Sequence, residues 1–267
     1  MAGRKFGQAK KTEVKKRTER SRAKTGHSRM KKAAWIAGAA CILLLAVGLL
    51  YVSRKLHRPH IEISSEEYPI SGIDVSNHNG RINFRKVAAD DVDFVYIKAS
   101  EGADFRDSRF SANCDSAGRA GLKVGAYHFF RMNGDGRLQS ANFLASISGK
   151  MLDMPLVIDV EDWGNESAES IEMVKQNLAE MIMCLEAAGR RVMIYTNKDG
   201  YDNYIKEGFS HYDLWLCTFR HPSRVKNYNW KILQYSHWGE VDGISGEVDL
   251  NVFNGTCEQW EAWLQGH

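Results

Sequence analysis

The 267-residue sequence lacks the motifs of several large functional classes. None of its five cysteines forms a Cys-x-x-Cys pair, so neither a zinc site nor thioredoxin-type redox chemistry is indicated. It contains neither Gly-x-Gly-x-x-Gly nor Gly-x-x-x-x-Gly-Lys-Ser/Thr, which argues against a nucleotide-binding fold. No Ser-His-Asp or Cys-His set occurs at an informative spacing, which disfavours nucleophilic acyl transfer. We therefore expect no cofactor.

The composition is that of an ordinary folded protein. Hydrophobic residues make up 43% and charged residues 26% of the chain, which is enough apolar material for a sizeable core. Wholesale disorder and a disulfide-held miniprotein are both excluded. An oxidising compartment would permit disulfides within the folded part, although small buried thiols fit the same four cysteines equally well: Cys114, Cys184, Cys217 and Cys257.

Charge is divided unevenly along the chain. Residues 1–32 hold 13 Lys and Arg against two Glu, a net charge of +11, whereas residues 60–267 hold 20 basic and 31 acidic groups, a net charge of −11. Binding to nucleic acid depends on clustered Lys and Arg that neutralise phosphates. We therefore expect no nucleic-acid partner for the acidic part of the chain.

Residues 33–52 form an uncharged, mainly apolar run that is long enough to cross a bilayer. The basic excess on its N-terminal side predicts a cytoplasmic tail at residues 1–32 and a signal anchor at residues 33–52, with everything that follows outside the cytoplasm. A cleaved signal peptide fits less well, because the run is longer than usual and no small-x-small cleavage site precedes Arg54. The sequence thus predicts a single-pass membrane protein that faces the cell envelope.

A folded domain is expected over residues 71–267, after a polar stalk at residues 53–70. Eight apolar runs have the length and composition of strands: Gly72–Val75, Phe94–Ala99, Val124–Phe130, Leu156–Val160, Val192–Thr196, Leu214–Thr218, Ile232–Tyr235 and Val248–Phe253. Helical periodicity separates several of them, at Arg109–Ala120, Leu138–Ile147 and Ser167–Ala188. Strands alternating with helices indicate parallel units, and eight favour a closed barrel. We predict an α/β fold, a modified TIM-like (β/α) barrel whose last strands are joined by loops.

Four acids stand in or directly after the predicted strands, where an α/β barrel places its active site: Asp74, Asp159, Glu161 and Asp249. Residues two apart on a strand face the same way, so Asp159 and Glu161 should point into one pocket. Burial and mutual repulsion raise the pKa of one carboxyl, which can then act as a general acid beside an ionised partner. Glycoside hydrolysis requires this division of roles.

Other readings of the acids stay open at this point. Any single acid can be a surface charge, a turn cap or half of a salt bridge, and the same oxygens could bind a metal ion. A metal site has little support, because no histidine accompanies the acids at ligand spacing. His128 and His237 are isolated in the sequence and could as well be hydrogen-bonded structural residues. We predict no metal.

Aromatic residues near the predicted strand ends could stack on sugar rings, although half or more of them should belong to the core. Seven aromatic residues lie at or near the predicted strand ends: Tyr127, Phe129, Trp163, Tyr195, Trp215, Tyr235 and Trp238. All of them except Trp215 are candidate substrate-binding residues, and Trp163 and Trp238, in glycine-containing loops, are the favoured platforms.

Six ordered motifs resemble those of glycoside hydrolase family 25, the lysozymes of the Chalaropsis and cellosyl type. They are Gly72-Ile73-Asp74-Val75-Ser76, Tyr96-Ile97-Lys98-Ala99-Ser100-Glu101-Gly102, Gly125-Ala126-Tyr127-His128-Phe129, Asp159-x-Glu161, Gln234-Tyr235-Ser236 and Val248-Asp249-Leu250-Asn251. The resemblance extends over about Ser71 to Gly255. It departs from the family at Asn79, where the family usually has Gln; the amide is one methylene shorter, so Asn79 becomes a candidate substrate-positioning residue.

This resemblance implies hydrolysis of the β-1,4 bond between N-acetylmuramic acid and N-acetylglucosamine in peptidoglycan. Glu161 would be the general acid. Asp159 would assist, by stabilising positive charge or by orienting the N-acetyl group of the substrate as internal nucleophile, while Asp74 and Asp249 would shape the site. Two alternatives remain: a membrane-tethered module that binds peptidoglycan with little catalysis, and a hydrolase of another carbohydrate on the same barrel. The sequence indicates no protein partner.

Overall fold

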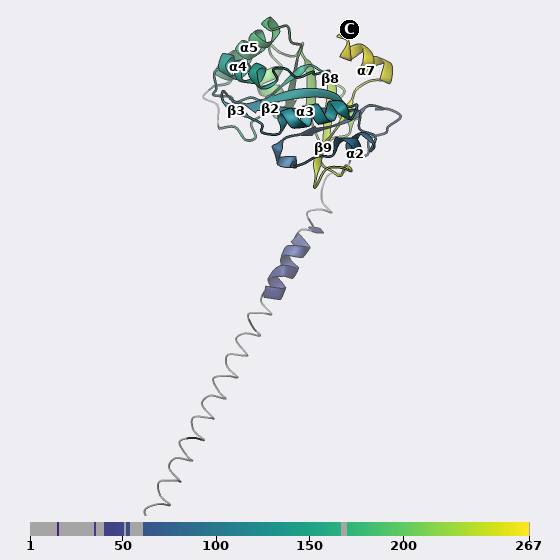
Figure 1. The fold of residues 1–267 in the computed structure, drawn as a ribbon. Coiled ribbons are helices and arrows are strands. Elements are labelled where there is room, and N and C mark those ends of the chain that lie inside the picture. Colours follow the sequence, from purple (N-terminus) through teal and green to yellow (C-terminus); the bar gives the residue numbers. More distant parts are fainter. Residues whose placement is uncertain are drawn as a thin grey trace, which may run out of the picture. The chain divides into compact units, whose positions relative to one another are not determined.

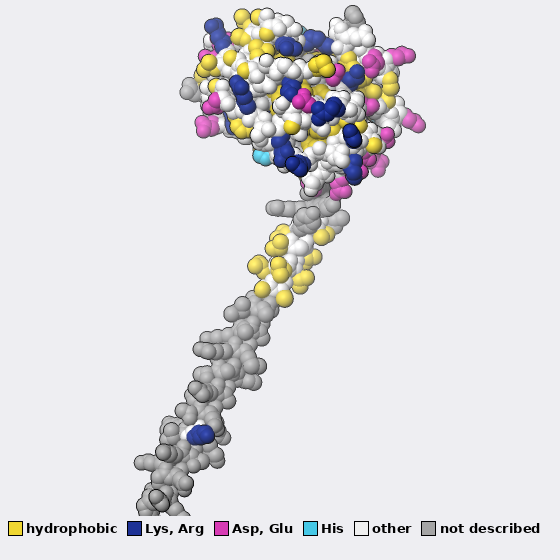
Figure 2. All heavy atoms as spheres, viewed as in Figure 1, with side chains coloured by type: hydrophobic (Ala, Val, Ile, Leu, Met, Phe, Trp, Pro, Cys, Tyr) yellow, Lys and Arg dark blue, Asp and Glu magenta, His cyan; other side chains and the backbone are white. Residues whose placement is uncertain are grey.

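The computed structural model describes Lys15, Trp35 and residues 40–50, 52–53, 61–166 and 170–266. The chain divides into two units, residues 1–58 and residues 59–267. In the first, residues 40–50 are helical and their large apolar side chains are exposed (Figure 2). No helix within the described ranges has the length and apolarity needed to cross a membrane. Apart from Lys15, Trp35 and residue 52, the remainder of the predicted anchor and the basic tail lie outside the described residues.

The second unit is built on a sheet of nine strands, eight of which close into a barrel in the order β1-β9-β8-β7-β6-β5-β4-β2, with β2 paired to β1 (Figure 1). Short β3 extends the sheet beside β2. The strands are β1 (Ser71–Val75), β2 (Phe94–Glu101), β3 (Phe105–Arg106), β4 (Lys123–Phe129), β5 (Leu156–Asp159), β6 (Val192–Asn197), β7 (Asp213–Cys217), β8 (Trp230–Gly239) and β9 (Val248–Phe253). All eight predicted strands are present.

The helices flank this barrel. They are η1 (Asn77–Asn79), α2 (Phe84–Ala88), α3 (Phe110–Arg119), α4 (Gly136–Ser146), α5 (Ile171–Ala187), α6 (Lys198–Gly200), η2 (Tyr201–Ile205), η3 (Pro222–Arg224) and α7 (Cys257–Leu264). The three predicted helices are α3, α4 and α5. The last of them begins later than predicted, because the Ser170 side chain accepts a hydrogen bond from the Met173 amide and caps the first turn.

The last strand departs from the parallel pattern. β9 runs antiparallel to both β8 and β1, whereas the other barrel pairs are parallel. Eight residues separate β8 from β9, too few for the crossover that a parallel return would need. The expected loop-joined end of the barrel is therefore confirmed, and the reversal brings the start of β9 to the edge where the parallel strands end.

Apolar side chains fill both faces of the barrel wall. The interior contains a cluster of large aromatic and aliphatic groups that includes Phe94, Tyr96, Trp215, Phe253 and Trp260. Aliphatic side chains on the outer faces of the strands pack against the helices. Successive side chains along each strand therefore point alternately to the barrel interior and to the helix layer, because a strand repeats every two residues.

Two glycines let interior rings lie against the wall. A Cβ atom on Gly72 would come within 2.4 Å of the Phe94 ring, and one on Gly125 within 2.2 Å of the Tyr96 ring. Any larger residue at these positions would displace a fully buried aromatic side chain. The bulky rings in the interior therefore depend on glycine in the neighbouring strands.

The end of the segment predicted as a stalk packs on the barrel. Tyr68 and Ile70 are buried, and the Tyr68 ring lies 5.9 Å from the ring of Trp230 between centroids. Within the described residues, the folded unit thus takes in part of the predicted stalk.

Candidate active site

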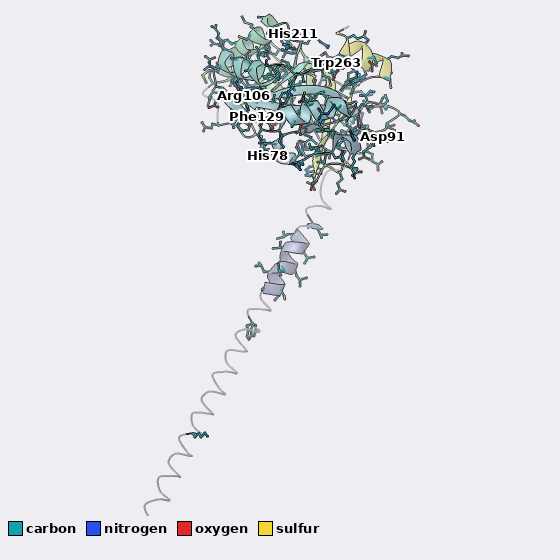
Figure 3. All side chains as sticks on the ribbon, in the orientation of Figure 1. His78, Asp91, Arg106, Phe129, His211 and Trp263 are labelled. Atoms are coloured by element: carbon teal, nitrogen blue, oxygen red, sulfur yellow. The ribbon has the colours of Figure 1, made fainter. Side chains whose placement is uncertain are left out.

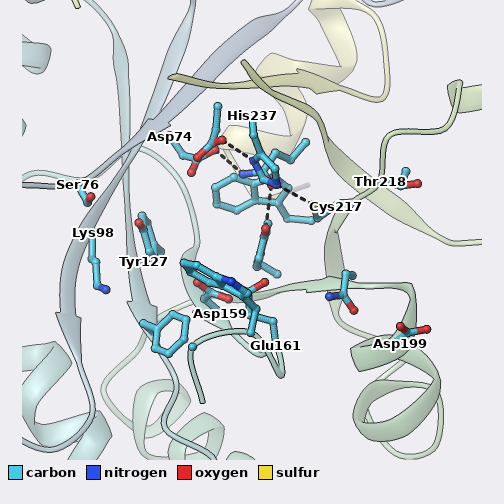
Figure 4. Close-up of a pocket in the computed structure, with 18 of the residues that line it drawn as sticks. Asp74, Ser76, Lys98, Tyr127, Asp159, Glu161, Asp199, Cys217, Thr218 and His237 are labelled. Atoms are coloured by element: carbon cyan, nitrogen blue, oxygen red, sulfur yellow. Dashed lines mark hydrogen bonds and ion pairs between the residues drawn. The ribbon is translucent and has the colours of Figure 1, made fainter. Parts of the chain in front are cut away.

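A cavity of about 1060 Å³ lies where the parallel strands of the barrel end (Figure 4). All four acids proposed from the sequence line it: Asp74, Asp159, Glu161 and Asp249. Its size exceeds that of most drug-sized ligand sites, so it can hold an extended ligand. The carboxyl ends of the strands therefore carry the candidate site, as predicted for a barrel of this kind.

Asp74 and Asp249 face each other across neighbouring strands, as directly opposed partners of β1 and β9. Asp74 is buried, and its Oδ2 accepts hydrogen bonds of 2.8 Å from the side-chain amides of Gln234 and Asn251. Burial and the nearby Asp249 carboxylate raise the pKa of Asp74 well above its usual range, while the two amides oppose this. Asp74 is thus fixed in position by neutral donors.

The two amides are themselves oriented by aromatic side chains of the barrel interior. The Tyr195 hydroxyl donates to Gln234 Oε1, and the Trp215 indole N–H donates to Asn251 Oδ1, each at 2.8 Å. These bonds assign the amide orientation, because each oxygen is occupied as an acceptor and each nitrogen is left to face Asp74. The interior aromatic core therefore supports the carboxylate directly.

Asp159 and Glu161 form the second pair of acids. Asp159 ends β5 and Glu161 follows two residues later, and both side chains point into the cavity (Figure 4). Burial, followed by repulsion from Glu161, raises the pKa of Asp159 well above its usual range. Burial raises the pKa of Glu161 to about 7, and neighbouring His237 opposes the rise. A carboxyl that is half protonated near neutrality can donate and recover a proton.

One oxygen of Asp159 is conspicuous. Among the described residues, no protein group forms a hydrogen bond with its buried Oδ1 atom. A buried carboxylate oxygen without a donor is costly unless a ligand supplies one. Asp159 Oδ1 is therefore a buried acid oxygen whose hydrogen-bonding capacity the described protein groups leave unused.

A histidine pairs with the fourth acid. His237 Nδ1 lies 2.5 Å from Asp249 Oδ1, and its Nε2 lies 3.9 Å from Cys217 Sγ. Burial opposes the charged imidazole, but the bond to Asp249 outweighs it and raises the pKa of His237 to about 10. The cavity thus contains an imidazolium beside its acids. Sequence patterns alone assign His237 no particular role in the site.

A second ionic group lies on the β2 and β4 side of the cavity. Glu101 bridges the Lys98 ammonium, at 2.6 Å, and the Arg131 guanidinium. Although burial alone would raise the pKa of Glu101, the two cations hold it below the usual value. Both cations lie over the Phe129 ring, about 5.0 Å from its centroid. Their charges were not singled out from the sequence as site groups.

The predicted sugar-binding residues divide into two sets. The cavity lining includes Tyr127, Phe129, Trp163 and Tyr195, together with Trp215. Trp163 is 77% exposed, which leaves its ring face free for a ligand, whereas Tyr195 and Trp215 are buried and hold the amide donors.

The other three lie outside the lining. Asn79 accepts a hydrogen bond of 2.9 Å from the Ser76 amide and thus closes the turn after β1. Tyr235 alternates with Gln234 and packs in the outer cluster around Leu233. Trp238 packs against Phe219, with ring centroids 5.1 Å apart, and it is Phe219 that lines the cavity.

His128 is a buried structural residue. Its Nδ1 lies 2.8 Å from Ser100 Oγ and its Nε2 lies 3.2 Å from Gln139 Oε1. Burial lowers its pKa to about 4, so it is neutral at physiological pH. In the part of the chain that the structure describes, no three His, Cys, Asp or Glu side chains are arranged to hold a metal ion.

Comparisons with known proteins agree with this geometry. The sequence model for "Glycosyl hydrolases family 25" matches residues 73–244. The chain is similar to Uncharacterized protein YegX of Escherichia coli K12, with 35% identity over 206 residues that cover 74% of this chain and 75% of that protein. It is also similar to Lysozyme M1 of Streptomyces globisporus, with 34% identity over 207 residues, 70% of this chain and 69% of that protein.

Solved structures show the same similarity. A family 25 glycosyl hydrolase from Bacillus anthracis superposes with a TM-score of 0.70 at 33% identity, covering 77% of this chain and 97% of that one. A bacterial lysozyme from Streptomyces coelicolor superposes with a TM-score of 0.66 at 30% identity, covering 74% and 97% of the two chains.

Proposed function

Because this chain belongs to glycosyl hydrolase family 25, we propose that it is a peptidoglycan hydrolase, a lysozyme of the Chalaropsis and cellosyl type. The bond cleaved is the β-1,4 linkage between N-acetylmuramic acid and N-acetylglucosamine. The observation that carries the proposal is the pair of neighbouring acids in the cavity, of which Glu161 has a pKa of about 7. Such a carboxyl serves as general acid at neutral pH.

In the proposed reaction, protonated Glu161 donates its proton to the glycosidic oxygen as the bond to the anomeric carbon breaks. The resulting carboxylate then accepts a proton from the water that attacks the sugar, which restores the enzyme. Asp159 assists from the adjacent position, either by stabilising positive charge on the sugar or by orienting its N-acetyl group. The free Oδ1 atom of Asp159 is consistent with both roles, because each requires an oxygen that no described protein group occupies.

The remaining site residues supply position and surface. Asp74 and Asp249 line the cavity, Tyr127 and Trp163 offer ring surfaces to the sugars, and Phe129 lines the cavity beneath Lys98 and Arg131. Aromatic rings contribute large contact areas at small entropic cost, and the exposed Trp163 ring is the more accessible of the two that face the sugars.

The test compares the full-length protein with two glutamate variants on insoluble peptidoglycan. Glu161→Gln removes the proton donor, whereas Glu166→Gln changes an exposed glutamate five positions later that does not line the cavity. Bound protein is measured by sedimentation, and released fragments are measured in the supernatant.

Wild type and Glu166→Gln should release soluble fragments, and Glu161→Gln should bind without releasing them. Sedimentation of all three proteins with no release by any of them would overturn hydrolysis and indicate a binding module.

We also propose that residues 33–52 anchor the enzyme, with residues 1–32 in the cytoplasm and the catalytic domain on the envelope side. The uncharged run and its basic flank support this arrangement. Protease added outside intact spheroplasts should degrade the catalytic domain and leave the tail protected. Protection of the catalytic domain until the membrane is broken would contradict it.

A further inference from the structure

His237 reaches the cavity because β8 is irregular at this position. The β8 and β9 pairing shifts register between Gln234 and Ser236 and again between Ser236 and Gly239. His237 and Trp238 therefore both lie opposite the single residue Asp249. Bulges of this kind turn a side chain away from the regular alternation and recur beside active sites. The local backbone is thus shaped to bring this imidazole to Asp249.

The environment of His237 is mainly acidic. Asp249 contacts it from β9, Cys217 lies near it from β7, and the Asp74 and Glu161 carboxyls are close enough to interact with its charge from β1 and from the segment after β5. The ring of Phe219 covers it at 4.9 Å between centroids and limits solvent on that side. His237 is therefore the cation next to three carboxyls.

The two opposed acids of β1 and β9 have different partners. Asp74 is held by neutral amides, whereas Asp249 is held by an imidazole that can carry charge. Two facing carboxyls with neutral partners alone would compete for a proton with each other and with Glu161. The His237 imidazolium places a positive charge on the Asp249 side of this group of carboxyls.

We infer that His237 is a positioning residue that orients the Asp249 side chain and supplies the compensating charge that sets the pH range in which Glu161 exchanges its proton. Only the kinetic consequence rests on the proposed hydrolase function, because the pairing of His237 with Asp249 is a property of the folded chain. Another cation near Glu161, Lys98, is already paired with Glu101 and lies on β2, which β1 and β9 separate from β8 in the barrel. It does not replace His237 beside Asp249.

The first arm of the test needs no activity. Full-length protein with labelled histidine side chains is titrated by NMR, and the His237 signal is assigned by its loss in His237→Gln. The signal should remain that of an imidazolium through pH 8, and in Asp249→Asn it should return toward the usual histidine range near 6.5. A wild-type His237 signal that titrates near 6.5 would overturn the inference whether or not the protein is a hydrolase.

The second arm measures the pH dependence of kcat/KM on peptidoglycan fragments. Loss of the cation should raise the pKa of Glu161, the general acid, so the alkaline limb of the profile of His237→Gln should move to higher pH, by about one unit. His211→Gln is the matched control, because His211 is exposed and does not line the cavity (Figure 3). A uniform fall in activity with an unmoved alkaline limb would show a merely structural role and contradict the inference.

Discussion

The two ends of the barrel use the same strands for opposite purposes. At the end where the parallel strands begin, helix α7 packs Trp260 against Phe94 and Phe253, with ring centroids 5.3 and 5.0 Å apart. The Trp263 indole, labelled in Figure 3, donates a hydrogen bond to Asp213 at the start of β7. At the other end, carboxyls with raised pKa values line the cavity. One end buries aromatic rings, and the other brings carboxyl groups together.

This difference separates stability from chemistry. Burial of large rings contributes free energy of folding, whereas burial of carboxyls consumes it. The aromatic end and the interior therefore stabilise a scaffold that can tolerate the acidic end. Substitutions at the two ends should accordingly affect different measurements, and the predictions below are ordered by the size of the expected effect.

At the acidic end, Glu161→Gln should reduce kcat by about 10²- to 10⁴-fold, because an amide cannot donate the proton. It should also stabilise the fold at pH 8. Folded Glu161 keeps its proton up to about pH 7, while the unfolded residue releases it near 4.5, so stability falls as the pH rises through this window. Glutamine stays neutral in both states.

The expected gain in free energy of unfolding is about 1–2 kcal/mol at pH 8 and vanishes below pH 4. Urea unfolding at both pH values measures it. A variant that lost activity together with stability would break the proposed separation of the two ends.

At the aromatic end, Trp260→Ala should lower the free energy of unfolding by about 3–5 kcal/mol, because Trp260 is only 3% exposed and its loss leaves a large cavity. The folded variant should keep a kcat close to that of wild type, since Trp260 does not line the cavity. Thermal unfolding and turnover at a temperature where the variant is folded measure both quantities. A large loss of kcat in the folded variant would show that the aromatic end also affects catalysis, and would contradict the separation of stability from chemistry.

The outer layer offers a test that depends on pH. Buried His128 has a pKa of about 4 in the folded state, below its usual 6.5, so unfolding takes up protons. Above pH 6.5 His128 is neutral in both states, so its titration does not change the free energy of unfolding. As the pH drops toward 4, the free energy of unfolding should fall by about 2–3 kcal/mol, because only the unfolded state binds the proton.

The contribution of His128 is isolated by comparison with His128→Gln, which keeps hydrogen-bonding groups without titrating. The difference in unfolding free energy between the two proteins should shrink on acidification. A constant difference from pH 7 to pH 4 would show that His128 is not held neutral.

The smallest effect is expected at exposed Trp163, the matched control for Trp260. Trp163→Ala should leave the free energy of unfolding within about 0.5 kcal/mol of wild type. Loss of a sugar-stacking face should weaken substrate binding by about 1 kcal/mol, which appears as a several-fold rise in KM. An unchanged KM would remove Trp163 from the substrate-binding set.

The sequence predicted the barrel because buried strands appear as apolar runs. It predicted four of the acids that line the cavity because they stand in or directly after such runs, but not Glu101 and Asp199. It did not predict the direction of β9, since apolar periodicity is the same in either orientation. The role of His237 depends on register shifts that leave no pattern in the chain. The outward position of Tyr235 could have been predicted, because successive side chains on a strand face opposite ways and Gln234 faces inward.

Helix α7 was not predicted, although it has local signals. Thr256 and Gln259 form a capping box at its start, and Trp260 and Trp263 are three residues apart on its buried face. On the surface, both Lys and Arg and Asp and Glu are present on the face drawn in Figure 2. Such charges carry little information about which residues meet in the cavity.

The central claim is best tested by identifying the new reducing ends that the full-length protein creates in peptidoglycan, using mass spectrometry after borohydride reduction. The account predicts reduced N-acetylmuramic acid from wild type and none from Glu161→Gln. Reduced N-acetylglucosamine from wild type, or equal yields from both proteins, would contradict it.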